Sequence, residues 1–118
     1  MKTKLTIEES GNLFDQGFSA RQATARTTKG YYDWGEWTEY TYEVFSLEDL
    51  LKILIEKITI NGIDFYYSIN PPTEVNNQWT VLYETIDREK VENSISGSGE
   101  EMIDAIYDAI MNQMMCEI

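Results

Sequence analysis

Residues 58–86, ITINGIDFYYSINPPTEVNNQWTVLYETI, carry the strongest secondary-structure signals of this sequence and predict a small antiparallel meander. Asn61-Gly62 is the strongest short-range signal for a two-residue β-hairpin, because both central residues of a type I′ turn need positive φ. Apolar and polar residues then alternate as far as Pro71-Pro72, which end the strand because proline cannot donate to a β-ladder. Residues 78–86 are the third strand of the expected antiparallel meander.

The middle strand of this meander places its large apolar side chains on one face, because a period of two brings alternate residues together. These residues are Ile63, Phe65, Tyr67 and Ile69. A three-stranded sheet with one apolar face is marginal alone, so we expect helices to cover that face. The opposite face is the alternative if Tyr66 and Leu82 are buried instead.

Helix signals stand on the N-terminal side of the meander. Thr6-x-x-Glu9 is a capping box that opens a short helix, which Gly17 ends. Ser19-x-x-Gln22 repeats the pattern and predicts a second short helix from about Ala20 to Arg26. A third helix starts after Ser46, a good N-cap, and runs to about Ile55.

The segment after the meander predicts a linker and one further helix. Asn93 to Gly99, NSISGSG, has the composition of a flexible linker. The last helix begins at Glu100 and carries Ile103, Ile106 and Ile110 along one face, at the spacing of an amphipathic helix. The fold class that follows is α+β, as a single domain over residues 1–118. It is a three-stranded antiparallel meander, with or without a fourth edge strand, packed against short helices and a C-terminal helix.

Residues 31–45, YYDWGEWTEYTYEVF, are the aromatic-rich outlier of the sequence. The alternation from Glu39 onward predicts a strand, and the part around Gly35 reads as a loop. As a binding surface, it offers the candidate residues Tyr31, Tyr32, Trp34, Glu36 and Trp37, because exposed aromatic residues are enriched at protein interfaces. The alternative is that Trp34 and Trp37 fold back and cover the edge of a small core.

The amino-acid composition excludes several kinds of catalytic and metal-binding chemistry. The 118 residues include no histidine, which excludes histidine-dependent general bases, nucleophile activation and zinc sites. No glycine-rich phosphate-binding motif is present, so no cofactor is expected. Asp104 and Asp108 lie one helical turn apart and could share a divalent cation, although a solvated helix face explains them equally well.

The net charge of −12 bears on partners and location. An acidic surface repels phosphate backbones, which argues against direct nucleic-acid binding and is compatible with a basic protein partner. No apolar run reaches the length of a membrane-spanning helix, and residues 1–10 lack the apolar segment of a signal peptide. With Cys116 as the single cysteine, a cytoplasmic location is the expectation.

Several segments together resemble a known group of proteins. The segments are TIEES, FSLEDLLKIL, the Asn61-Gly62 strand pair, WTVLYE and GEEMIDAIYDAIMNQM. In this order the chain resembles small uncharacterised proteins from phages and mobile elements of Bacteroides-type gut bacteria. The resemblance implies a phage or mobile-element origin and assigns no catalytic or binding residue.

Two functions follow as hypotheses. The first is a non-enzymatic accessory protein of a phage or mobile element, acting by protein–protein interaction; the missing catalytic motifs favour it. The alternative is a small carboxylate-based or divalent-metal-dependent hydrolase, suggested by the abundance of acidic residues.

The charge gives a first testable prediction. Because phosphate contacts supply most non-specific affinity for DNA, we expect a fluorescence-anisotropy titration with duplex DNA to show no binding at micromolar protein. Salt-sensitive micromolar binding would contradict the prediction.

Overall fold

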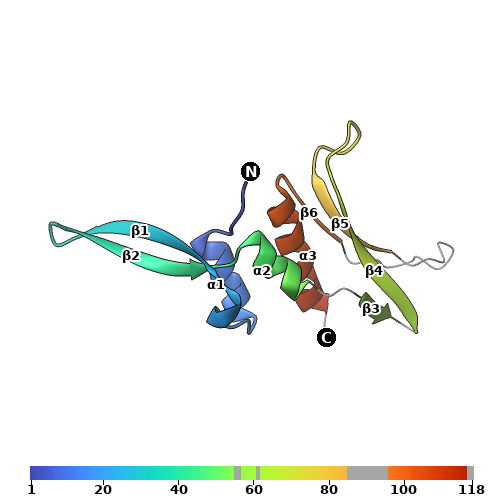
Figure 1. Ribbon diagram of the computed structural model, residues 1–118, viewed down its shortest axis with the longest axis horizontal. Helices are drawn as coiled ribbons and strands as arrows, with labels where there is room; N and C mark the ends of the chain where they lie inside the picture. The colour runs from blue at the N-terminus through green and yellow to red at the C-terminus, as the bar shows by residue number, and fades with distance from the viewer. Residues whose placement is uncertain (55–56, 61, 85–95, 117–118) are drawn as a thin grey trace. The chain divides into compact units, whose positions relative to one another are not determined.

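The computed structural model describes residues 1–54, 57–60, 62–84 and 96–116 of the chain (Figure 1). In chain order its elements are α1 (Ile7–Asp15), the 3-10 turn η1 (Ala20–Gln22), β1 (Ala25–Asp33), β2 (Glu36–Val44), α2 (Leu47–Ile53), β3 (Lys57–Ile60), β4 (Ile63–Asn70), β5 (Trp79–Glu84), β6 (Ser96–Gly99) and α3 (Met102–Cys116). The α+β class, with antiparallel sheets, short helices and a C-terminal helix, is confirmed.

The chain divides into two compact units. One comprises residues 3–49, and the other comprises residues 1–2 together with 50–118, so the division falls within α2. That residues 1–118 act as one domain stays a prediction. Each unit has a buried core of its own.

The second unit contains a four-stranded antiparallel sheet in the order β3-β4-β5-β6. Its first three strands are the predicted meander. Ile60 and Ile63 are register partners, and Gly62 has a φ of 79°, as the predicted turn requires. Asn61 lies outside the described residues, so the turn type itself stays a prediction.

The fourth strand lies where a linker is predicted. Residues 96–99 form β6, which pairs with β5 from Trp79↔Gly99 to Leu82↔Ser96, where a flexible linker was predicted. Residues 93–95 of the predicted linker are not among those described. The aromatic strand, which was the candidate for an extra edge strand, belongs instead to a separate two-stranded sheet with β1.

Helix α3 packs on one face of this sheet, alongside β5 and β6 (Figure 1). The covered face carries Phe65, Val81 and Tyr83, all buried, with the Tyr67 ring 6.2 Å from that of Tyr83. This is the face predicted to meet the helices, although the side chain of Ile63 is outside the described set. The helix contributes the fully or nearly fully buried residues Ile103, Ala105, Ile106, Ala109 and Ile110.

Two glycines set how closely α3 approaches β6. A Cβ at Gly97 would overlap the backbone nitrogen of Ala109 and the carbonyl oxygen of Ala105. A Cβ at Gly99 would lie 2.6 Å from the Cβ of Asp104. The strand and the helix therefore meet backbone to backbone, and the glycines serve close packing here instead of flexibility.

The first unit is built on α1 and the base of the β1–β2 hairpin. The capping box is confirmed, since Glu9 N–H donates to Thr6 Oγ1 (3.1 Å) and Thr6 N–H donates to Glu9 Oε1 (3.0 Å). Leu13 is fully buried, and the helix ends before Gly17, whose φ is 104°. Another α1 residue, Ser10, is 1% exposed and accepts a hydrogen bond from Phe45 N–H (3.1 Å).

The second predicted helix is largely wrong. Helical structure covers Ala20–Gln22 as one 3-10 turn, and the chain becomes β1 at Ala25. Ser19 N–H does donate to the Gln22 side chain (2.8 Å), so the local capping contact forms. Residues 25–33 have no apolar face that would favour a helix, and pairing with β2 determines their conformation.

The close approach of β6 to α3 can be tested at Gly97. Gly97→Ala should destabilise the protein by about 1–3 kcal/mol, toward the upper end, because the new methyl group meets backbone atoms that cannot rotate away. Urea denaturation measures the effect. The matched control is Gly11→Ala in α1, where a Cβ has nothing within 4 Å; it should stabilise by a few tenths to about 1 kcal/mol. Equal stability of the two variants would contradict the packing described.

Candidate interaction surface

The β1–β2 hairpin is not among the sequence predictions, which place one strand from Glu39 onward and a loop around Gly35. Its strands pair without a break from Ala25↔Val44 to Asp33↔Glu36, leaving Trp34 and Gly35 as a two-residue turn. Both turn residues have positive φ, 55° and 79°, as in a type I′ turn. The prediction of a loop around Gly35 is thus wrong except for these two residues. The turn could not be predicted from the sequence because tryptophan is rarely found at positive φ.

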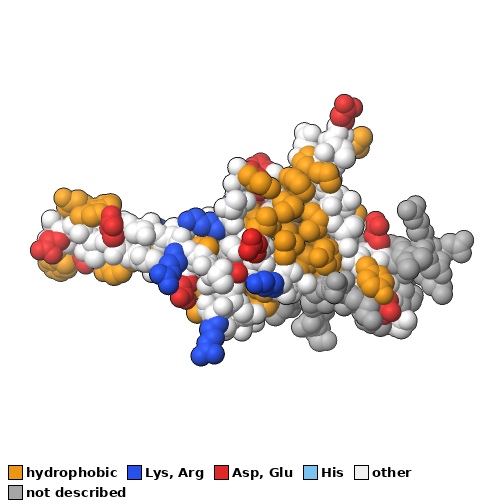
Figure 2. All heavy atoms as spheres, in the orientation of Figure 1, with side chains coloured by type: hydrophobic (Ala, Val, Ile, Leu, Met, Phe, Trp, Pro, Cys, Tyr) orange, Lys and Arg blue, Asp and Glu red, His pale blue; other side chains and the backbone are white. Residues whose placement is uncertain are grey.

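All five predicted binding residues lie at the outer end of this hairpin, which we call the hairpin tip (residues 31–37). The exposed fractions are 97% for Trp34, 75% for Tyr32, 60% for Trp37 and 39% for Tyr31, and Glu36 is also exposed. Figure 2 shows hydrophobic and acidic side chains gathered there. The exposure of both tryptophans disfavours the alternative in which they cover a core edge. A binding role for the five residues remains a prediction.

The register sorts the tip residues onto two faces, because residues directly opposite each other in a sheet share a face. On the first face, Tyr32 is opposite Trp37, with ring centroids 5.9 Å apart in an edge-to-face arrangement. On the second face, the Tyr31 and Tyr40 rings meet edge to face at 5.8 Å. Such cross-strand aromatic pairs each contribute roughly 0.2–1 kcal/mol to a hairpin.

Trp37 is the centre of the first face. Its ring lies over Gly30, where any Cβ would overlap it, so Gly30 provides the space that the indole occupies. The indole Nε1–H donates to Glu39 Oε1 at 3.3 Å. These contacts hold an exposed aromatic ring and a carboxylate side by side in a fixed orientation.

The second face is arranged around Tyr31. The Lys29 Nζ lies 5.3 Å from the centroid of its ring, within cation–π range. A hydrogen bond with Tyr42 lowers the pKa of Tyr31 below its ordinary value, and the positive charge of Lys29 adds to this effect. The same hydrogen bond raises the pKa of Tyr42. This face therefore already holds a cation of its own.

Two carboxylates lie opposite each other beside the turn. Asp33 and Glu36 are register partners, so like charges stand directly opposite each other, which destabilises a hairpin. Trp34 adds a further cost, since a side chain in the left-handed region costs about 1–2 kcal/mol. Local conflicts of this kind are expected at functional sites.

The other end of the hairpin is held by Asp49. This carboxylate is 4% exposed and accepts hydrogen bonds from Thr24 N–H (2.8 Å), Thr24 Oγ1 (2.9 Å) and Ser46 N–H (2.9 Å). Asp49 N–H in turn donates to Ser46 Oγ (3.2 Å), which confirms Ser46 as the N-cap of α2. Burial alone would raise the pKa of Asp49, but the donors from Ser46 and Thr24 outweigh it and lower the pKa.

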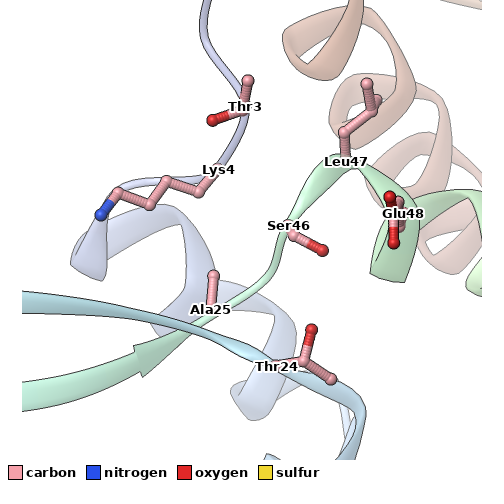
Figure 3. A pocket seen from close by; sticks show the side chains of 7 residues that line it. All are labelled: Thr3, Lys4, Thr24, Ala25, Ser46, Leu47 and Glu48. Atoms are coloured by element: carbon pink, nitrogen blue, oxygen red, sulfur yellow. The ribbon is translucent and has the colours of Figure 1, made fainter.

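A shallow hollow lies beside this contact (Figure 3). It is lined by Thr3, Lys4, Thr24, Ala25, Ser46, Leu47 and Glu48. Two of its polar side chains, Thr24 and Ser46, are bonded to Asp49, and Lys4 Nζ donates to the carbonyl of Arg26 (2.8 Å). These three polar side chains thus serve the local structure.

Asp104 and Asp108 of α3, the two carboxylates that could share a divalent cation, also have partners within the chain. Asp104 pairs with Lys2 Nζ at 2.6 Å, and Asp108 accepts the N–H of Ser98 in β6 at 3.0 Å. These contacts account for both carboxylates without a shared cation. Within the described ranges, no group of three or more acidic or cysteine side chains is arranged to hold a metal ion.

Comparisons with family models, curated proteins and solved structures gave no match. Among the helices of the described residues, none is both long enough and apolar enough to cross a membrane.

The Asp49 contact predicts a pH dependence of stability. A lowered pKa in the folded state means that the contribution of Asp49 is present above the unfolded value of about 3.9 and is lost as the pH falls through the folded value. Asp49→Asn should cost about 1–3 kcal/mol at pH 7, and its difference from the wild type should shrink below about pH 4. Urea denaturation across this pH range measures both.

The matched control for this prediction is Glu48→Gln, which removes the neighbouring, exposed carboxylate of the same helix turn. It should change the free energy of unfolding by less than about 0.5 kcal/mol. A difference between Asp49→Asn and the wild type that is the same at pH 3 and pH 7 would contradict the assigned role.

Proposed function

We propose that this chain is a non-enzymatic accessory protein of a phage or mobile element, acts in the cytoplasm and works by binding another protein through the hairpin tip. The origin rests on the resemblance of its sequence segments, and the cytoplasmic location on the sequence composition. The mode of action rests on the tip itself. One observation carries it: Trp34 is 97% exposed and held at positive φ at the end of a hairpin whose two strands have nine residues each.

The position of Trp34 suits binding. A side chain at the turn reaches farther from the body of the hairpin than any side chain along the strands. Tryptophan and tyrosine are the residues that most often supply binding energy at interfaces, because they bury a large area with little loss of conformational freedom. Tyr32 and Trp37 lie next to the turn and enlarge the aromatic surface.

The charge of the tip indicates the partner. Asp33 and Glu36 oppose each other at the turn, and a positive charge brought by a partner would relieve their repulsion. Arginine fits best, since its guanidinium group stacks on aromatic rings and pairs with carboxylates. The proposed partner is therefore a basic protein.

The experiment is a comparison of the wild type with the double variant Trp34→Ala, Trp37→Ala. Affinity capture from host lysate, with quantitative mass spectrometry, should recover a basic protein with the wild type and lose it with the variant. Thermal stability should change little, because the lost aromatic pair is worth at most about 1 kcal/mol.

The matched control is Val75→Ala, which alters another apolar side chain, 99% exposed, outside the hairpin. It should capture the same protein as the wild type. A large fall in melting temperature for the double variant would show that the tryptophans support the fold, and equal capture by all three proteins would exclude the tip as the binding surface.

A further inference from the structure

We infer that the partner presents an arginine guanidinium to one face of the hairpin, the face that carries Tyr32, Trp37 and Glu39. This inference rests on the proposed function. It adds which side of the hairpin is used, which chemical group the partner brings and which carboxylate pairs with it.

Tyr32 and Trp37 form an aromatic platform with a defined orientation. Tyr32 and Trp37 are opposite each other across the strands, and their rings stand at 61° with centroids 5.9 Å apart. They are 75% and 60% exposed, so each ring offers a free surface. Gly30 lies beneath the indole and keeps it close to the sheet. The platform is ordered before any partner arrives, which reduces the entropy lost on binding.

The carboxylate of Glu39 lies beside this platform. Glu39 Oε1 accepts the indole Nε1–H of Trp37 (3.3 Å), which places the acid at the edge of the ring. The register partner of Glu39 is Gly30, which has no side chain to neutralise it, whereas Glu43 on the same face is opposite Arg26. A planar guanidinium lying on the indole can donate to this carboxylate, which a compact ammonium group does less well.

On the opposite face of the hairpin, the aromatic ring of Tyr31 already has a cation beside it. There, Lys29 Nζ already lies 5.3 Å from the centroid of Tyr31. A cation brought to the Tyr31 ring would have to displace Lys29, although Asp33 and Glu36 lie on the same face, at the turn. The face with Glu39 carries no such obstacle among the contacts of the described residues.

The test is an NMR titration of the full-length protein with two short peptides, Gly-Ser-Arg-Ser-Gly and Gly-Ser-Lys-Ser-Gly, with blocked ends. The indole N–H signals of Trp34, Trp37 and Trp79 are assigned from single Trp→Phe variants. Trp37 should shift in a saturable way with the arginine peptide, and about two- to fivefold more weakly with the lysine peptide. Trp79, in β5, serves as the internal reference.

Two charge variants make the test specific. Glu39→Gln removes the charge while its amide oxygen can still accept from the indole, and it should weaken arginine-peptide binding about two- to fivefold. Glu43→Gln removes the same charge from the same face of the same strand and should leave binding unchanged. Circular dichroism verifies that both variants are folded.

The outcomes separate this inference from the proposed function. A shift of Trp34 alone, unaffected by Glu39→Gln, would overturn the assigned face and leave the hairpin tip as the binding surface. Equal weakening by the two charge variants would show diffuse attraction and also overturn it. No shift at Trp37 would overturn it as well, while the lysate capture tests the proposed function independently.

Discussion

The carboxylate of Asp49 fixes both strands of the β1–β2 hairpin at their base. Thr24 immediately precedes β1, Ser46 closely follows β2, and both donate to this one side chain. The same residue completes the N-cap of α2. A two-stranded hairpin is marginal in water by itself, so a fixed base is the condition for a long exposed arm. The buried carboxylate is tolerated because its oxygens are satisfied by these donors.

From this base to the tip, the stabilising interactions change in kind. Near α1 the hairpin is held by burial, with Val44 and Phe45 fully buried and the Phe45 ring 5.2 Å from that of Phe14. Toward the tip, cross-strand pairs of aromatic rings replace burial, and they leave the ring surfaces exposed. The unfavourable features, a tryptophan at positive φ and two opposed carboxylates, are confined to the turn. Stability is thus concentrated at the base, and the surface available for binding is at the tip.

The other unit, residues 1–2 and 50–118, is stabilised by a different kind of contact. Its sheet and α3 are joined by apolar burial together with direct backbone proximity at Gly97 and Gly99. Tyr83 is completely buried there, and burial raises the pKa of its hydroxyl. The Asp108 carboxylate also receives a β6 N–H, so a polar contact fixes the strand against the helix.

Elements whose signals are local could be predicted from the sequence alone. The Thr6 and Ser46 caps, the alternation in β4 and the apolar stripe of α3 each depend on residues within a few positions of one another. The aromatic stretch was also recognised from composition, although its structure was not. The strands β1 and β6, in contrast, depend on tertiary contacts and could not be predicted. Residues 25–33 have no hydrophobic period because nearly all their side chains are at least partly exposed, and the Ser-Gly segment 96–99 reads as a linker until α3 lies against it. In both segments the conformation is determined by a partner distant in sequence, and local propensity carries no information about such a partner.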